Sequence, residues 1–234
     1  MSEQFSRTAM LLGQSAVDRL SNSCVAVFGV GGVGGYVVEG LARSGVGSFI
    51  LIDHDVVSLS NLNRQIIALH STVGKKKVEV AKDRILDINP TAKVRTYDKF
   101  YLPDDDEVNL DGVDYIVDAV DTVSAKIEII MQADKLGIPV ISSMGTGNKT
   151  DPTAFEIKDV FDTNNCALAK VMRRELKARG IKSLTTVCSR QLPIKRQAQE
   201  GQRKPTPASV AWCPSVAGLI IASKVVSDLT NENN

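Results

Sequence analysis

A glycine-rich turn between an apolar run and a helical stripe constrains this chain more than any other feature. Residues 24–28 form a short apolar run that is typical of a buried parallel strand. The turn that follows fits the pattern GxGxxG and precedes apolar residues with helical spacing; its glycines are Gly29, Gly31, Gly32 and Gly34. Glycines permit such a tight turn and let backbone amides approach phosphate oxygens at the positive end of a helix. The pattern therefore predicts a strand–turn–helix unit that binds a nucleotide.

Strand and helix patterns alternate through the first half of the chain. Further strand patterns, with helical stripes among them, lie at residues 49–52, 93–98, 115–117 and 138–141. Such alternation is typical of a parallel sheet with helices on both faces. We therefore expect an α/β protein with a Rossmann-like, doubly wound, mostly parallel sheet. Its 234 residues suit a single domain, with 1–150 as the nucleotide-binding half and 151–234 as a substrate-side region.

The second half is less regular, and we expect it to add a C-terminal strand and helix region to the sheet. Residues 155–158 fit an edge strand, and residues 214–229 return to a helical stripe. Residues 167–179 fit an amphipathic helix whose expected buried side consists of Ala167, Leu168, Val171, Met172 and Leu176. Residues 185–207 hold three prolines and no sustained period, which predicts a long crossover loop.

Positive charge is concentrated in one part of the chain. Residues 165–204 hold eleven lysines and arginines against two glutamates, a net charge of +9, whereas the whole chain carries +1 and the remainder therefore −8. Such segregation is expected of a polyanion-binding element on an acidic protein body. A basic helix face beside a basic loop, with Trp212 close by, suits tRNA. The polar face of the expected helix carries Lys170, Arg173, Arg174 and Lys177. A solvated surface without a partner is the alternative explanation.

The composition excludes several classes of protein. With 43% hydrophobic and 24% charged residues, the chain is neither disordered nor fibrous. Its four cysteines form no CxxC pair, which argues against a zinc knuckle or a disulfide scaffold, and we assign none of them a catalytic role. The longest apolar runs, 25–33 and 216–222, are too short to cross a bilayer, and the N-terminus lacks the layout of a signal peptide. We therefore expect a cytoplasmic protein without a membrane partner.

The loop after the second expected strand distinguishes between nucleotides. Asp53 follows Gly34 by 19 residues and is placed to bind ribose hydroxyls, which by itself would equally suit an NAD-dependent dehydrogenase. The loop then supplies Arg64, and the next helix opens with Lys77. Cations stabilise the negative charge that shifts to a departing pyrophosphate. The loop therefore favours ATP as a substrate.

Asp121 is the candidate ligand for a magnesium ion. It follows the fourth expected strand, at the edge where open parallel sheets bind ligands. Carboxylate oxygens suit Mg²⁺ held between ATP phosphates. A helix N-cap is the alternative role of Asp121, and the two roles are compatible.

These motifs occur in the order found in a known superfamily. The chain resembles the ubiquitin-activating-enzyme-like adenylating enzymes (the ThiF/MoeB type) over roughly residues 5–150. The motifs that carry the resemblance are the glycine turn, residues 53–55 and 60–65, Val73-Gly74 with Lys77, Asn89-Pro90, and Asp118 with Asp121. The resemblance implies that Asp53 holds the ribose, that the triphosphate is contacted by Asn61, Arg64 and Lys77, and that Asp121 carries the metal. It also implies a homodimer in which each subunit lends an arginine, Arg7 in this sequence, to the other's site.

The predicted site combines these implications. The residues expected to bind ATP are Gly29, Gly31, Gly32, Gly34, Asp53, Asp55, Asn61, Arg64, Gln65, Lys77 and Asp121. The residues expected to act in catalysis are Arg7, Asn61, Arg64, Lys77 and Asp121, with Asp121 as the metal ligand.

Within the superfamily, the chain is similar to tRNA threonylcarbamoyladenosine dehydratases in residues 148–153, 157–160, 168–176 and 214–218. That similarity implies an enzyme that uses ATP and magnesium to activate the carboxylate of a modified adenosine in tRNA, which then cyclises with loss of water. Sulfur-carrier activators usually have two CxxC pairs, which this chain lacks, although its residues 58–61 are closer to theirs. Adenylation of a ubiquitin-like sulfur carrier, with a sulfurtransferase-type partner protein, is the alternative function. The non-catalytic alternative is a scaffold that only binds tRNA or relays sulfur.

Overall fold

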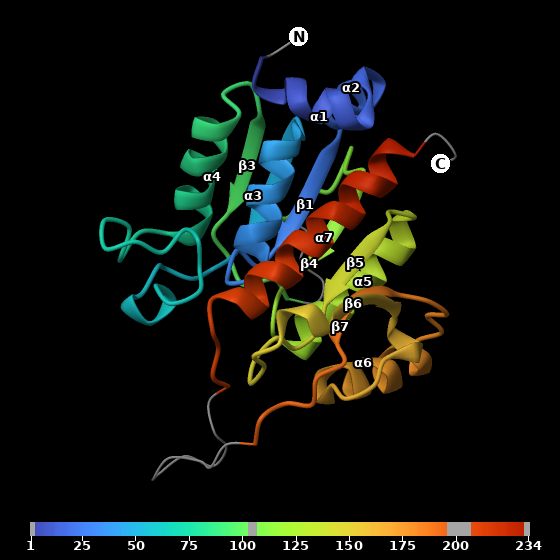
Figure 1. Cartoon of the computed structure of the whole chain (residues 1–234). Helices are drawn as coiled ribbons and strands as arrows, with labels where there is room; N and C mark the ends of the chain where they lie inside the picture. Colours follow the sequence, from blue (N-terminus) through green and yellow to red (C-terminus); the bar gives the residue numbers. More distant parts are fainter. Residues whose placement is uncertain (1–2, 103–106, 196–206, 232–234) are drawn as a thin grey trace.

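The chain folds into a seven-stranded sheet with helices on both faces (Figure 1). This computed structural model describes residues 3–102, 107–195 and 207–231. The strands are β1 (Cys24–Phe28), β2 (Ser48–Ile52), β3 (Lys93–Tyr97), β4 (Tyr115–Asp118), β5 (Val140–Ser143), β6 (Phe155–Asp159) and β7 (Thr185–Ser189). The α-helices are α1 (Ser6–Leu12), α2 (Gln14–Asn22), α3 (Gly34–Ser44), α4 (Lys77–Ile88), α5 (Val123–Leu136), α6 (Ala167–Ala178) and α7 (Trp212–Thr230). Short 3-10 helices lie at Glu3–Phe5, Leu59–Asn61, Pro152–Ala154 and Val160–Asp162.

The strand order confirms the predicted doubly wound, mostly parallel sheet. The order is β3-β2-β1-β4-β5-β7-β6, and only β6 runs antiparallel to its neighbour. The order reverses between β1 and β4, which pair in parallel with Val27 opposite Val117. Open sheets of this kind leave a crevice at the carboxyl ends of the strands where the order reverses. The fold therefore predicts a ligand site beyond Phe28 and Asp118.

The core has a layer on each face of the sheet, because successive side chains of a strand point to opposite faces. Val25 and Val27 pack in a cluster with residues of α3, α4 and α7. Ala26 and Phe28 pack in a second cluster with Ile129 of α5. Both faces of β1 are therefore buried, which explains why its sequence is continuously apolar.

Helix α7 packs closely against α3. Its inward side chains include Cys213, Ala217 and Ile221, all fully buried. A Cβ on Gly218 would lie 2.4 Å from the carbonyl oxygen of Val33, so the two helices meet at a position that only glycine can occupy. Among the described residues, α7 is the one helix long and apolar enough to cross a membrane by length and composition alone, although it packs in the core as core helices do.

Two sequence-based expectations about the second half are wrong. Residues 185–189 are not loop but strand β7, which lies between β5 and β6. The hydroxyl side chains of this strand interrupt the apolar run that is expected of a buried strand. Thr186 is nevertheless buried, and its hydroxyl donates to the Lys158 carbonyl. Residues 196–206 of the expected loop lie outside the described residues. On α6 the predicted buried Ala167 is exposed, because the inward face is formed by Ala169, Met172 and Leu176.

We expect Gly34→Ala to destabilise the protein. A Cβ at this position would lie 1.8 Å from the Gly29 carbonyl oxygen, so the turn and α3 would have to separate. Thermal or urea unfolding should show a loss of about 3 kcal/mol or more. Gly31→Ala is the matched control, since its nearest contact is a side-chain atom at 3.8 Å. Equal stability of the two variants would contradict the close approach.

Candidate active site

A cavity of about 530 Å³ lies at the carboxyl ends of the parallel strands, where the fold predicts a ligand site. Both halves of the chain line it, from Phe28 to Pro214. The predicted ATP-binding residues that line this cavity are Gly29, Gly31, Gly32, Asp53, Asp55, Asn61, Arg64, Gln65, Lys77 and Asp121. Gly34 lies behind the turn, in the contact already described.

Asp53 fixes the shape of the glycine turn. One carboxylate oxygen accepts the Val30 backbone N–H at 2.7 Å, and the other accepts the Asp55 N–H at 2.9 Å. Gly29 adopts a left-handed conformation, with φ of 85°, and a Cβ there would lie 2.8 Å from the Ala119 carbonyl oxygen. The turn is thus held between the ends of β2 and β4, with one edge of Asp53 facing the cavity.

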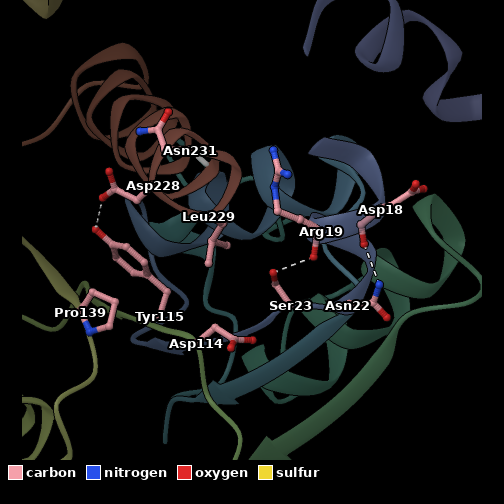
Figure 2. Close-up of a pocket in the computed structure, with 10 residues that line it drawn as sticks. All are labelled: Asp18, Arg19, Asn22, Ser23, Asp114, Tyr115, Pro139, Asp228, Leu229 and Asn231. Atoms are coloured by element: carbon pink, nitrogen blue, oxygen red, sulfur yellow. Dashed lines mark hydrogen bonds between the residues drawn. The ribbon is translucent and has the colours of Figure 1, made fainter. Parts of the chain in front are cut away.

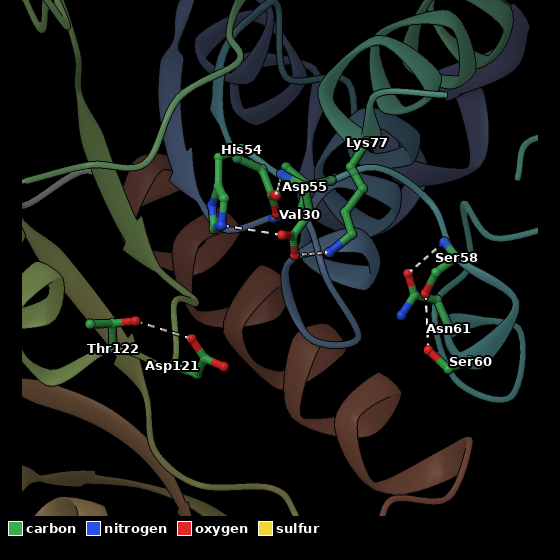
Figure 3. Close-up of polar contacts among 10 residues, drawn as sticks. Val30, His54, Asp55, Ser58, Ser60, Asn61, Lys77, Asp121 and Thr122 are labelled. Atoms are coloured by element: carbon green, nitrogen blue, oxygen red, sulfur yellow. Dashed lines mark hydrogen bonds and ion pairs between the residues drawn. The ribbon is translucent and has the colours of Figure 1, made fainter. Parts of the chain in front are cut away.

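The cationic end of the cavity centres on Lys77, the first residue of α4. Its ammonium lies 2.6 Å from Asp55, which also lies 3.2 Å from the His54 imidazole (Figure 3). Burial alone would raise the pKa of Asp55, but the hydrogen bond and charge of Lys77 outweigh it and lower that pKa. Arg64 is held nearby, since its guanidinium donates to the Ser60 carbonyl at 2.8 Å. Two cations and a helix N-terminus therefore face one cavity, a suitable arrangement for phosphates.

Two buried amides complete this wall. The Asn61 side chain accepts the Ser58 N–H at 3.0 Å, which holds it at the end of a short 3-10 helix. The Gln65 side-chain oxygen is buried and has no hydrogen-bond partner among the described residues. Because buried polar atoms are normally satisfied, Gln65 presents an acceptor for a ligand or a water molecule.

Asp121 lies on the opposite wall of the cavity. Figure 3 shows it apart from the Lys77–Asp55 group, and the nearest polar contact of its carboxylate is the Thr122 hydroxyl at 3.4 Å. The alternative role as helix N-cap is wrong, because Thr122 occupies that position of α5. The Asp121 carboxylate is exposed, and its oxygens can therefore bind a cation.

Besides Gly34, Arg7 is a predicted site residue that does not line this cavity. It is exposed on α1, which Figure 1 shows at the far end of the sheet. The ring of Phe5, just before α1, lies against Gly45 at the C-terminal end of α3. The cavity lies at the other end of that 11-residue helix, roughly 16 Å away. Within one chain, Arg7 does not reach the site.

Sequence reasoning missed a fully buried network beneath the cavity. The Lys126 ammonium donates to the Asp118 carboxylate at 2.9 Å and to the Ser143 carbonyl at 2.8 Å. Asp118 also accepts the Ser142 hydroxyl at 2.5 Å and the Val120 N–H at 3.3 Å. Lys126 and Asp118 are both completely inaccessible to solvent.

This network ties together the two loops that form the cavity floor. Residues 119–122 follow β4 and present Asp121, whereas Ser143, the last residue of β5, and residues 144–147 after it line the other part of the cavity. The sequence does carry a signal for it, since Lys126 shares the inward stripe of α5 with Ile129, Ile130 and Ala133. A lysine on an apolar stripe needs a buried acceptor, and Asp118 ends a buried strand.

The cysteines near the cavity are not activated thiols. Cys213 is fully buried at the start of α7, and Cys188 is buried in β7. Burial raises the pKa of each of these thiols. A protonated thiol is a poor nucleophile, so the site offers no thiolate from either residue.

A second, larger cavity of about 770 Å³ lies at the opposite end of the strands (Figure 2). Two of its polar side chains have partners: the Tyr115 hydroxyl donates to Asp228 at 2.8 Å, and Asp114 accepts the backbone N–H of Cys24. Burial, and then the neighbouring Asp228, raise the pKa of Tyr115. This cavity contains none of the predicted site residues.

The fold and the site together are those of a Rossmann-type nucleotide-binding protein whose cavity has a cationic end. The chain belongs to the ThiF family, whose pattern it matches over residues 5–234. It is 44% identical to a tRNA threonylcarbamoyladenosine dehydratase of Bacillus subtilis, a match that covers 99% of this chain and 96% of the relative.

A solved structure and a more distant relative extend this comparison. The chain superposes on the Escherichia coli tRNA N6-threonylcarbamoyladenosine dehydratase TcdA in complex with AMP with a TM-score of 0.90 and 31% identity, covering 97% of this chain and 94% of that one. The same enzyme in complex with ATP gives a TM-score of 0.87. The adenylyltransferase and sulfurtransferase uba4 of Ogataea parapolymorpha is 37% identical, but over only 56% of this chain and 33% of its own length.

We expect Lys126→Met to destabilise the protein strongly. The change leaves the Asp118 carboxylate buried without its cation, which costs about 3–5 kcal/mol. The double variant Asp118→Asn with Lys126→Met removes both charges, so it should lose less stability than the two single variants together, by about 1 kcal/mol or more. Denaturant unfolding of the four proteins measures this difference. Additive losses would contradict the pairing.

Proposed function

We propose that this chain is an ATP-dependent dehydratase that adenylates the carboxylate of threonylcarbamoyladenosine in tRNA and closes it into a ring, releasing AMP and pyrophosphate. One observation carries the proposal: in a chain that matches a dehydratase from end to end, ten of the eleven predicted ATP-binding residues line one cavity. The Escherichia coli enzyme of this name has been solved in complex with ATP and with AMP, which supports an ATP-dependent activity for this chain.

The first step activates the carboxylate. A carboxylate oxygen of the substrate attacks the α-phosphorus of ATP, the bond from that phosphorus to the β-phosphate bridge breaks, and pyrophosphate leaves. Lys77 and Arg64 face the cavity where the departing charge develops and stabilise it, and the glycine turn donates backbone amides to phosphate oxygens. Asp53 binds the ribose. Asn61 and Gln65 orient the nucleotide from their buried positions.

Asp121 holds the magnesium ion in this proposal. Its exposed carboxylate on the wall opposite Lys77 supplies oxygen ligands of the kind that Mg²⁺ prefers. A bound magnesium ion would neutralise phosphate charge during adenylation. The buried Lys126 network holds the loop that carries Asp121, so the position of this carboxylate is set from below.

The second step needs no nucleophile from the enzyme. The carbamoyl oxygen of the same substrate attacks the activated carbonyl carbon, the bond to AMP breaks, and a proton leaves the carbamoyl nitrogen. Because the attacking oxygen already belongs to the substrate, ring closure is intramolecular and fast. The buried, protonated Cys213 and Cys188 agree with such a mechanism.

The proposed tRNA contacts begin at helix α6. Leu168, in its first turn, lines the cavity, so a tRNA whose modified base enters the cavity passes along this helix. Lys170 and Lys177 face solvent without a carboxylate partner among the described residues. The other cations of this helix also have partners within the chain: Arg173 donates to Thr163 at 2.6 Å, and Glu175 binds Arg174 and Arg179. Arg196, Arg203 and Lys204 lie outside the described residues.

A homodimer would complete the site with Arg7 from the second subunit. Arg7 lies on α1, remote from the cavity of its own chain. The same helix exposes Met10 and Leu11, each to 84%, which is unusual for side chains of this size and suits a subunit interface. We include the dimer in the proposal on these two observations.

The remaining parts of the proposal follow from the substrate. Residues 1–150 handle the nucleotide and residues 151–234 the tRNA, although both halves line the cavity. The protein is cytoplasmic, where tRNA is modified. A sulfurtransferase-type partner stays a prediction, and so does the alternative activity on a ubiquitin-like carrier, whose uba4 relative matches only about half of the chain.

We expect bulk tRNA bearing threonylcarbamoyladenosine to lose the mass of one water per modified base, roughly 18 Da, when incubated with the protein, ATP and Mg²⁺. Mass spectrometry of the nucleosides measures the loss. Arg64→Ala should slow the reaction roughly 100-fold or more, because a cation that stabilises the leaving group is lost. Consumption of NADH without ATP, or adenylation of a diglycine-ended carrier with the tRNA mass unchanged, would overturn the proposal.

The shared site makes a separate prediction. Arg7→Ala and Arg64→Ala proteins should each be nearly inactive, but a mixture should recover up to about a quarter of wild-type turnover per site, because a mixed dimer contains one intact site. The recovery is measured after subunit exchange at matched concentration. A mixture as inactive as its parents would show that Arg7 does not act across an interface.

A further inference from the structure

The mouth of the cavity has a rim built from three segments that are far apart in the sequence. The Asn148 carbonyl accepts the Ile194 N–H at 2.8 Å, and the Asn148 side chain accepts the Ala208 N–H at 2.9 Å. The Gln191 side chain accepts the backbone N–H groups of Thr150 and Asp151. Residues 148–151, 191–194 and 208–212 are thereby joined into one surface, which we call the rim.

The rim presents an indole ring to solvent in a fixed position. Trp212 is 49% exposed, although it is the sole tryptophan and lies at the first turn of a core helix. Its ring nitrogen donates to the Thr150 carbonyl at 2.8 Å, which ties the ring to the neighbouring segment. Pro214, two residues further on, and Ser209, three residues before, both line the cavity. A flat aromatic surface therefore lies directly beside the cavity mouth.

Other exposed apolar side chains and two cations share the rim. Leu192 is 66% exposed and Ile194 is 49% exposed. Arg190 and Lys195 flank them, both exposed, and the Arg190 guanidinium is 3.7 Å from its nearest carboxylate, too far for a hydrogen bond. The rim therefore combines exposed apolar side chains with positive charge and is not an apolar patch alone.

We propose that Trp212 is a stacking platform for an unpaired tRNA base next to the modified adenosine. The inference rests on the proposed function, in which the modified base enters the cavity that the rim surrounds. Sequence-tolerant recognition of unpaired RNA commonly combines aromatic rings, on which bases stack, with cations that follow the phosphates. Trp212 supplies the ring, and Arg190 and Lys195 supply the cations on either side of the exposed Leu192 and Ile194.

Charge complementarity favours RNA over a second copy of the chain as the occupant. In the rim and its two flanking cations, Lys149, Arg190 and Lys195 stand against Asp151, a formal net charge of 3 − 1 = +2, so two rims facing each other would repel. The exposed apolar residues proposed for the dimer, Met10 and Leu11, lie on α1 at the other end of the sheet. An RNA would contact the positive charge through its phosphates and the exposed Trp212 ring through its bases.

The test compares Trp212→Ala, Trp212→Phe and Leu219→Ala in steady-state dehydration of modified tRNA. Leu219 is the matched control, since it is a large apolar residue on the same helix and is 47% exposed. We expect Trp212→Ala to raise the KM for tRNA roughly 5- to 140-fold, the loss of one stacked base. The KM for ATP and the turnover at saturating tRNA should stay within about twofold, and the other two variants should stay close to wild type.

Fluorescence gives a second readout that a purely structural role would not produce. Because Trp212 is the sole tryptophan, all tryptophan emission reports on the rim, and binding of tRNA should quench it. Equal effects of Trp212→Ala and Leu219→Ala, or no quenching at saturating tRNA, would overturn the inference. So would a loss of dimer in Trp212→Ala that accounts for the weaker tRNA binding, since a second copy would then cover the rim. If the wild-type protein dehydrates modified tRNA and Trp212→Ala has an unchanged KM for tRNA, this inference alone is refuted. If the wild-type protein does not dehydrate modified tRNA, the proposed function is refuted.

Discussion

The site depends on a contact between two stretches of backbone that approach more closely than side chains allow. Gly29, at the end of β1, meets the Ala119 carbonyl at the end of β4, and a Cβ there would lie 2.8 Å from that oxygen. Gly34, at the start of α3, meets the Gly29 carbonyl even more closely. Because β1 and β4 adjoin where the strand order reverses, these contacts bring a helix N-terminus to the crevice of the sheet. A nucleotide can then bind backbone amides directly.

Charge is arranged in two layers around this contact. Below it, Lys126 neutralises Asp118 in a region without solvent and donates to the Ser143 carbonyl, so the ends of β4 and β5 are joined there by a pair with no net charge. Above it, Lys77 and Asp121 face the cavity from opposite walls, with Asp121 left exposed. The ion pair sealed below the cavity has a positioning role. Lys77 and Asp121 line the cavity, so a bound ligand can replace the contacts that they make within the protein.

The sequence allowed the nucleotide half to be predicted because its signals are local. The glycine turn, the strand before it and Lys77 at the start of α4 each follow from a few adjacent residues. The errors arose where contacts between distant segments decide the outcome. Strand β7 is short and rich in hydroxyls, and only its place between β5 and β6 buries it. Likewise, no local pattern indicates that the oxygens of Thr163, ten residues earlier, hold the Arg173 guanidinium.

The substrate end of the cavity carries a chemical consequence. From Thr122 to Pro214 the residues that line it are small, apolar or hydroxylated, among them Gly145, Thr146, Gly147 and Ala208, and within the described part of the chain none of them has an ionisable side chain. An enzyme that had to generate its own nucleophile would need a base or a thiolate here. A substrate that carries its own attacking oxygen needs only to be held with that oxygen near the activated carbon, which shape and backbone can achieve. Charged side-chain contacts to such a substrate then have to come from outside this part of the cavity. The rim around Trp212 and the lysines of α6 lie where a nucleic acid could make such contacts.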